Sequence, residues 1–206
     1  MSSKTSNTPL LLFQPFNLAV FLAFYSPIVL SVIMLSLSFV FQNFKGFIFV
    51  AMLLAVSLAR HFFYKFNGAQ TLVPDGTICT SIQFTEYGNA TFSAFVFAFT
   101  IMYLAMPMIS NGDYNFYVLI GLLTYFFADV LIKVSKKCTV QMNELFLNAL
   151  AGMTASAAFV WLMYTGGSSK YLFFNEMSSN KEVCSMPKKQ TFKCQVYKDG
   201  TLVGSL

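Results

Sequence analysis

Residues 90–109, ATFSAFVFAFTIMYLAMPMI, carry no charged side chain and are predominantly apolar along their whole length. A helix needs about 20 predominantly apolar residues to cross the roughly 30 Å hydrocarbon core of a bilayer. Apolar residues on every side, rather than on one face, are typical of a helix that contacts lipid as well as protein. This stretch therefore predicts a transmembrane helix.

Four further segments have the same character: residues 16–41, 46–64, 114–135 and 145–164. The first contains Pro27 directly after Ser26, so we expect a single span with a kink, because neighbouring helices and hydroxyl groups can satisfy the freed carbonyl. Residues 110–113 (SNGD) are a turn signal, which predicts a tight hairpin between the spans on either side. The predicted fold class is an all-α polytopic membrane protein with about five transmembrane helices.

The composition favours the same class of protein. Of 206 residues, 56% are hydrophobic, 10% are charged and 25 are phenylalanine, whereas soluble domains carry about 25% charged residues. The formal net charge is +5, but most lysines and arginines lie in loops and the tail, where such residues set topology and contact anionic headgroups. We therefore expect the lipid bilayer as a partner, and no nucleic acid.

Three polar segments flank or interrupt the spans. Residues 1–15 precede a first span without a small-residue cleavage site, so we expect that span to be retained. Residues 67–89 form the longest internal polar stretch, and residues 166–206 form a soluble tail. In the tail, two strand-like runs flank Asp199-Gly200, which predicts a β-hairpin. The two runs are residues 191–198 and 201–203.

Five spans place the N-terminus and the loops after the second and fourth spans on one face of the membrane. The basic residues of that face are Lys4, Arg60, Lys65, Lys133, Lys136 and Lys137. By the positive-inside rule, we expect this face to be cytoplasmic. Residues 46–64 are shorter than the other spans and end in charge. A four-span alternative, in which they lie in the interface, would reverse the N-terminus relative to the tail.

The four cysteines contain no Cys-x-x-Cys pair, which argues against a zinc site, and no cofactor is expected. The spacing of Cys184 and Cys194 allows a disulfide between neighbouring strands if the tail is lumenal or exterior. Cys79 and Cys138 would share the cytoplasmic face, so we expect two unpaired thiols there.

Asp129 is the one carboxylate well inside an apolar span, and an aspartate at a helix centre costs about 2.5–3.5 kcal/mol on insertion scales. Lys133 follows at i+4, so we expect an ion pair near the membrane edge. The alternative is a proton or ion relay, which would combine Asp129 with Asn148 and with Thr100 or Thr124.

Two other groups of residues stand out in the spans. A four-residue spacing predicts a stripe that permits close helix packing, formed by Asn148, Gly152 and Ser156. The end of the second span carries three predicted interface anchors that reach headgroups: Arg60, His61 and Lys65. A buried functional pair of Arg60 and His61 is the alternative interpretation.

The sequence does not assemble a catalytic site. His61 is the only histidine, and the chain has no Gly-x-Ser-x-Gly motif or glycine-rich phosphate loop. Residues 88–93 (GNATFS) open a phenylalanine-rich helix and resemble the type-2 phosphatidic acid phosphatase family of membrane lipid phosphatases. The Pro-Ser-Gly-His, Arg-and-His and Lys/Arg-Pro motifs of that family are missing. We therefore expect no enzyme, and at most a catalytically dead relative.

Three runs together resemble small multi-span proteins of nucleocytoplasmic large DNA viruses, particularly the algal-virus branch: PDGTICTSIQF (74–84), GNATFSAFVFAFTIMYLAMPM (88–108) and YNFYVLIGLLTYFFADVLIKVSKKC (114–138). The resemblance implies a virion protein of the internal membrane beneath an icosahedral capsid. Such a protein would be a minor capsid component that binds capsid or coat proteins through residues 170–206 and 67–89. The leading hypothesis is thus a structural membrane anchor. The alternative is a small transporter or channel that uses Asp129 and Asn148.

Overall fold

The structure, a computed structural model, describes residues 15–68, 84–136, 138 and 142–173, and the backbone of residues 195–198 and 201–205. The chain divides into two compact units, Met1–Asn175 and Glu176–Leu206. The described part of the first unit is helical, and that of the second unit consists of two strands.

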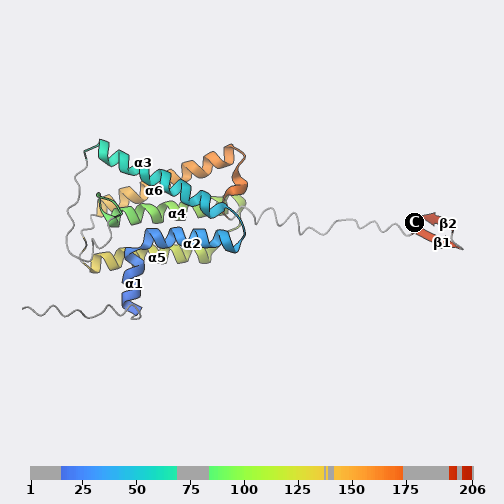
Figure 1. The fold of residues 1–206 in the computed structure, drawn as a ribbon, viewed down its shortest axis with the longest axis horizontal. Helices are drawn as coiled ribbons and strands as arrows, with labels where there is room; N and C mark the ends of the chain where they lie inside the picture. The colour runs from blue at the N-terminus through green and yellow to red at the C-terminus, as the bar shows by residue number, and fades with distance from the viewer. Residues whose placement is uncertain are drawn as a thin grey trace, which may run out of the picture. The chain divides into compact units, whose positions relative to one another are not determined.

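The first unit is a bundle of helices joined by turns and loops (Figure 1). The helices are α1 (Pro15–Phe24), α2 (Ser26–Val40), α3 (Lys45–Phe66), α4 (Asn89–Asn111), α5 (Phe116–Ser135) and α6 (Met142–Thr165). Among the described residues, four helices, α3 to α6, are long and apolar enough to cross a membrane, and there are five spans if α1 and α2 count as one. The chain thus has the architecture of a multi-pass helical membrane protein.

The first predicted span, residues 16–41, is broken rather than kinked. Its two helices are bent by 83°, at Tyr25, and α1 runs across the direction of α2 in Figure 1. Pro27 lies in the first turn of α2, where proline is favoured because the first N–H groups of a helix have no intrahelical partner. Proline therefore starts a new helix here, which corrects the expectation of one continuous span.

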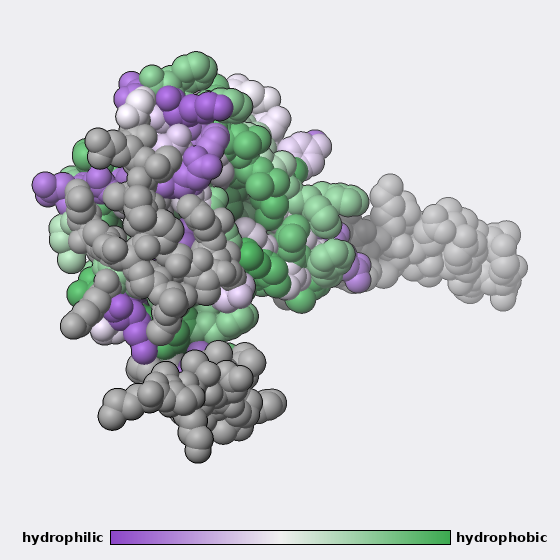
Figure 2. Space-filling view, turned by 60° about the vertical axis from the view of Figure 1, so that its left-hand side comes forward, coloured by the Kyte–Doolittle hydropathy of each residue, from purple (hydrophilic) through white to green (hydrophobic). Residues whose placement is uncertain are grey.

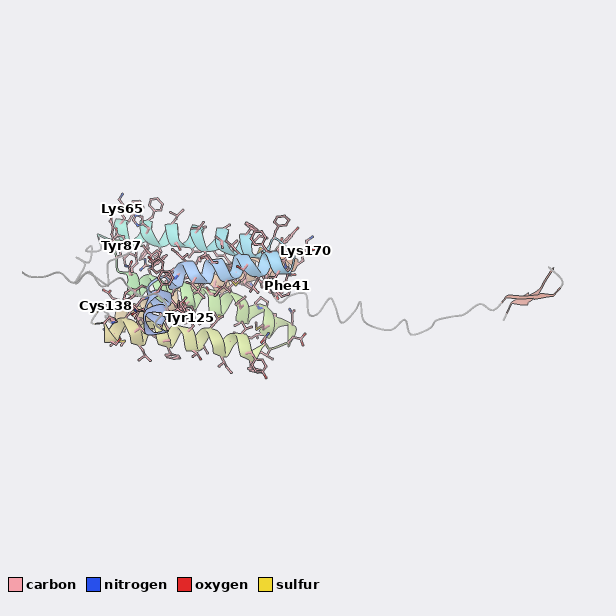
Figure 3. The ribbon with its side chains drawn as sticks, turned by 60° about the horizontal axis from the view of Figure 1, so that its bottom comes forward. Phe41, Lys65, Tyr87, Tyr125, Cys138 and Lys170 are labelled. Carbon is pink, nitrogen blue, oxygen red and sulfur yellow. The ribbon has the colours of Figure 1, made fainter. Side chains whose placement is uncertain are left out.

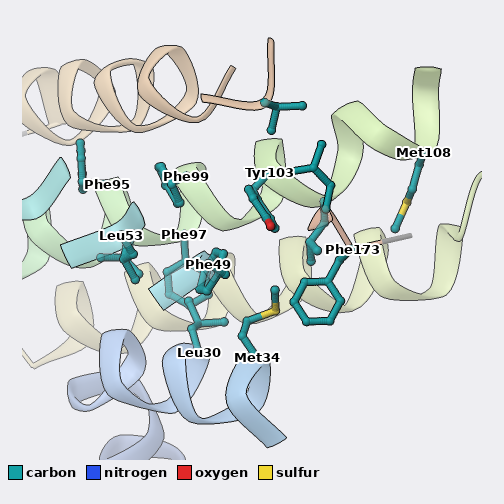
Figure 4. Packing of buried hydrophobic residues seen from close by; sticks show 14 residues of the cluster. Leu30, Met34, Phe49, Leu53, Phe95, Phe97, Phe99, Tyr103, Met108 and Phe173 are labelled. Carbon is teal, nitrogen blue, oxygen red and sulfur yellow. The ribbon is translucent and has the colours of Figure 1, made fainter. Parts of the chain in front are cut away.

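Helix α4 is the centre of the bundle. Within its most apolar 18-residue window, 67% of the residues are buried, against 11–22% for the other three candidate spans. Its most extensive packing is against α6. On another side, the ring of Phe49 from α3 lies 5.9 Å from Phe99 and 5.1 Å from Tyr103, centroid to centroid (Figure 4). The uncharged stretch at residues 90–109 is therefore surrounded by other helices.

Helix α5 has its charged residues inside and large apolar residues outside. Asp129 and Lys133 are its buried residues. Its exposed large apolar side chains are Phe116, Ile120, Leu123, Phe127, Leu131 and Val134. In Figure 2, hydrophobic residues cover much of the visible flank of the bundle. A helix in a soluble protein has the opposite arrangement, so this surface indicates lipid as the solvent.

The two ends of the bundle differ in the residues that they carry. Figure 3 shows Lys65, Tyr87 and Cys138 at one end, and Phe41 and Lys170 at the other. We call the first the Lys65 end; α3 and α5 finish there, and α4 and α6 begin there. Phe84–Gly88 of the predicted loop 67–89 are described at this end, whereas residues 69–83 lie outside the described residues.

After α6, a 3₁₀ turn, η1 (Ser169–Tyr171), leads to Leu172 and Phe173, which are buried against the core. In the second unit, β1 (Gln195–Lys198) pairs antiparallel with β2 (Thr201–Ser205), with an irregular register between Val196 and Tyr197. The predicted disulfide between Cys184 and Cys194 lies outside the described residues.

Candidate functional site

A buried ion pair joins Asp129 and Lys133, one turn apart on α5. Lys133 Nζ lies 2.8 Å from both carboxylate oxygens of Asp129. Ser26 Oγ donates a hydrogen bond of 2.8 Å to Asp129 Oδ1, and Ser93 Oγ lies 3.0 Å from Oδ2. Ser93 Oγ also accepts a 2.6 Å hydrogen bond from Lys133 Nζ. The two charges cancel, and every charged atom has a partner.

The ion-pair cluster connects three helices. Ser26 begins α2 and Ser93 lies near the start of α4, so Asp129 holds both helices against α5. One turn before Asp129, Tyr125 OH donates a 2.8 Å hydrogen bond to the carbonyl oxygen of Leu22 in α1. The break between α1 and α2 is therefore bonded to α5 from both sides.

The predicted pairing of Asp129 with Lys133 is present in the structure. Lys133 lies two residues before the end of α5, and the position of the pair near the membrane edge stays a prediction. Asp129 is 1% exposed and Lys133 is 3% exposed, so the pair is turned toward the other helices rather than outward. The reason is that the rest of α5 is apolar. If the pair faced outward, its charges would lie in lipid, which is unfavourable. The apolar side chains of α5 would gain nothing in return, because lipid solvates them as well as the protein interior does.

A second polar cluster surrounds Arg60 of α3. Its Nε donates a 2.9 Å hydrogen bond to Asn148 Oδ1 on α6, and Nη2 donates one of 3.3 Å to Thr91 Oγ1 on α4. The guanidinium carbon lies 4.7 Å from the ring centroid of Tyr64 and 5.5 Å from that of Phe92. Arg60 thereby links the Lys65 end of α3 to α4 and α6.

Asn148 is shared between Arg60 and Tyr64. The Tyr64 hydroxyl lies 3.2 Å from Asn148 Oδ1 and 3.0 Å from Nδ2. Asn148 Nδ2 also donates to the carbonyl oxygen of Glu144, one turn earlier on α6. The Tyr64 ring stacks on that of Tyr87 at 5.1 Å between centroids. This network positions the guanidinium of Arg60 from two sides.

The structure separates the three predicted interface anchors. Lys65 is exposed at the end of α3, and His61 is half-buried with its ring 5.7 Å from that of Tyr87. Arg60 is only 8% exposed, so it is not a freely exposed side chain, and its predicted contact with headgroups stays a prediction. The alternative pairing of Arg60 with His61 is not what buries it. Its hydrogen-bond partners are Asn148 and Thr91.

The two polar clusters lie on different sides of α4. Thr91 contacts Arg60 and Ser93 contacts Asp129, and residues two apart on an α-helix point about 200° apart. The relay alternative required Asp129 and Asn148 to share a polar cavity, and they lie in separate clusters. Of its other candidate members, Thr100 is bonded to the carbonyl of Val96, and Thr124 is exposed on the outer face of α5.

The predicted packing stripe faces α4. The buried residues of α6 are Asn148, Gly152, Ser156 and Val160. A Cβ atom added to Gly152 would overlap the carbonyl oxygen of Phe95 and lie 3.1 Å from the amide nitrogen of Phe99. The missing side chain of Gly152 is therefore what allows the backbones of α4 and α6 to approach each other this closely.

Cys138 is disulfide-bonded, which corrects the expectation that it is an unpaired thiol. The other cysteines, Cys79, Cys184 and Cys194, all lie outside the described residues. A disulfide at the Lys65 end is typical of an oxidising environment, whereas the basic residues of this end favour the cytoplasm. The two indications of orientation oppose each other.

We expect Cys138 in the purified chain to resist alkylation by a maleimide until a reductant is added, because its sulfur is already bonded. Peptide mapping after differential alkylation checks this and identifies the second cysteine. Cys138→Ser is the matched control: it should release one new reactive thiol without reductant. Alkylation of Cys138 under native, non-reducing conditions would contradict the disulfide.

Sequence reasoning missed the neutral residues that complete both clusters. Ser26, Ser93, Thr91 and Tyr64 are ordinary in membrane spans, and a hydroxyl there usually bonds to its own helix, as Ser31 does to the carbonyl of Pro27. The only available signal was indirect: a charged residue inside a span needs hydrogen-bond partners from other helices. Which hydroxyls supply them depends on helix rotation.

No group of three or more metal-ligating side chains occurs among the described residues. Their chemistry is that of internal ion pairing and hydrogen bonding between helices. Comparison with known proteins adds no relative, since no family model, curated protein or solved structure matches the chain.

Proposed function

We propose that this chain is a structural membrane anchor, whose bundle holds it in the bilayer while its soluble segments bind a partner protein. The observation that carries the proposal is that the buried polar side chains of both clusters bond the helices to one another. Asp129 and Lys133 neutralise each other, and Arg60 is held by Asn148 and Thr91. With apolar side chains facing outward, such a bundle is built to be rigid in lipid.

The soluble segments are the docking parts of the proposal. Residues 67–89 connect α3 to α4, and residues 170–206 follow α6. Strands β1 and β2 form a two-stranded ladder, and a two-stranded hairpin is marginally stable alone. Its open edges would gain hydrogen bonds by pairing with a strand of a partner. The tail is therefore expected to be stabilised by the partner.

The sequence resemblance to virion membrane proteins supplies the proposed partner and location. It implies a capsid or coat protein as the partner, and the internal membrane of a virion as the location. This part of the proposal rests on the resemblance of residues 74–138 alone.

A co-purification experiment tests the docking proposal. Membranes or particles from the source are cross-linked and solubilised, and the chain is captured with its bound proteins. We expect one coat protein at a fixed ratio to the full chain. Truncation after Asn175, at the boundary between the two units, should abolish its recovery and leave the chain in the membrane fraction.

A second variant separates the two docking parts. Replacing residues 69–83 by a glycine-serine linker of equal length keeps α3 and α4 intact and should weaken the same interaction. If no protein accompanies the full chain at a fixed ratio, or both variants retain it fully, the docking proposal is wrong.

A further inference from the structure

Arg60 carries a positive charge that no acidic side chain balances within the described ranges. Its partners, Asn148 and Thr91, are neutral, and the surrounding rings are those of Tyr64, Phe92 and Phe95. Arg60 is 92% buried, since its exposed fraction is 8%. A buried charge without a counter-charge is strongly unfavourable. Asp129, by contrast, is fully neutralised by Lys133.

One edge of the guanidinium remains available. The side edge is used, because Nε bonds to Asn148 and Nη2 to Thr91. Nη1 makes no hydrogen bond within the part of the chain that the structure describes. It is not one of the fully buried polar atoms that lack a partner there, so it keeps some contact with the surface. The remaining N–H groups of Nη1 and Nη2 point off the end edge in parallel, a geometry that matches two oxygens of one phosphate.

The guanidinium of Arg60 lies near one end of the apolar spans, where lipid headgroups are expected. Arg60 is six residues before the end of α3, which is about 9 Å along the helix axis. Its guanidinium bonds to Thr91, the third residue of α4, so it is level with the first turn of α4. Backbone N–H groups of a first turn favour anions, in addition to the charge of Arg60.

The surface next to Arg60 favours a lipid over a protein as the source of the anion. Phe63, which lies three residues after Arg60 and therefore on a neighbouring face of α3, is 67% exposed. Acyl chains can cover such aromatic side chains while the headgroup lies above them. An acidic protein segment would have to enter between helices whose outer surface is apolar.

We propose that Arg60 binds the phosphate group of an anionic lipid at the Lys65 end of the bundle. Asn148 and Thr91 hold the guanidinium in place, and the three aromatic rings cover it. The phosphate supplies the missing counter-charge and accepts hydrogen bonds from Nη1 and Nη2. This site is independent of the docking function, because it uses only residues of the helices.

Thermal unfolding of the full chain in a neutral detergent tests the proposal. Phosphatidic acid in mixed micelles should raise the melting temperature in a saturable way, because it binds the folded state. Diacylglycerol with the same acyl chains lacks the phosphate and should leave the melting temperature unchanged. An equal rise with inorganic phosphate would assign the site to free phosphate and keep the phosphate chemistry of the proposal.

Three variants assign the effect to Arg60. Arg60→Gln removes the charge, and Arg60→Lys keeps the charge but loses the paired N–H edge; each should weaken phosphatidic acid binding at least about tenfold, the effect of losing a charged hydrogen bond. Arg60→Lys carries the test if Arg60→Gln does not fold. Lys170→Gln removes an exposed charge at the other end of the bundle (Figure 3) and should bind as the wild type does. Equal binding by wild type and Arg60→Lys, or loss in Lys170→Gln alone, would overturn the proposal.

Discussion

Asp129→Asn is expected to lower the free energy of unfolding of the bundle by about 3–5 kcal/mol, because it leaves the ammonium of Lys133 buried without a counter-charge. The substitution keeps the size of the side chain, so packing is little affected. Ser26 and Ser93 would also lose a charged hydrogen-bond partner. Reversible unfolding in mixed micelles with increasing dodecyl sulfate, followed by circular dichroism, measures the change.

Two further variants separate charge burial from a general loss of carboxylates. Glu86→Gln changes an exposed carboxylate and should alter stability by no more than about 0.5 kcal/mol. The double variant Asp129→Leu with Lys133→Met removes both charges and should recover most of the lost stability, as apolar replacements of buried ion pairs do. An Asp129→Asn effect as small as that of Glu86→Gln would show that the pair is not buried.

Gly152→Ala is expected to destabilise the bundle by about 1–3 kcal/mol, the cost of overpacking a tight contact. The added Cβ would overlap the carbonyl oxygen of Phe95, and a backbone atom in the middle of a helix cannot move aside as a side chain can. Helices α4 and α6 would have to separate along their most extensive interface. The same unfolding measurement detects the loss.

Gly121→Ala is the matched control for this prediction. Gly121 is exposed on α5, and a Cβ added there meets no atom within 4 Å. Alanine has a higher helix propensity than glycine by about 1 kcal/mol, so this variant should be as stable as the wild type or more stable. Equal effects of the two substitutions would mean that α4 and α6 are not in close contact at Gly152.

Most of the helical architecture could be predicted from the sequence. The apolar stretches at residues 90–109 and 114–135 correspond to α4 and α5, and each helix boundary lies within a few residues of the predicted one. The bilayer sets the length of a span, so apolar runs and turn signals are sufficient to locate it. The break at Tyr25 was not predicted, because proline in the middle of an apolar run is compatible with a kink and with a new helix.

The polar clusters could be predicted only in part. Asp129 and Lys133 are four residues apart on one helix, so their pairing follows from helix geometry alone. The burial of Arg60 depends on Thr91 and Asn148, which lie 31 and 88 residues away along the chain. No local pattern indicates that these residues meet.

By itself, the sequence determined that the chain has several membrane-length helices, where each lies, and which residues carry charge within them. These properties follow from hydrophobicity and local helix geometry. Only the tertiary structure decided how each helix is rotated, and therefore that Arg60 is buried and that α4 is the central helix. The physical reason is that apolar side chains face lipid and protein with similar free energies, so the orientation of a membrane helix depends on its polar partners and close contacts.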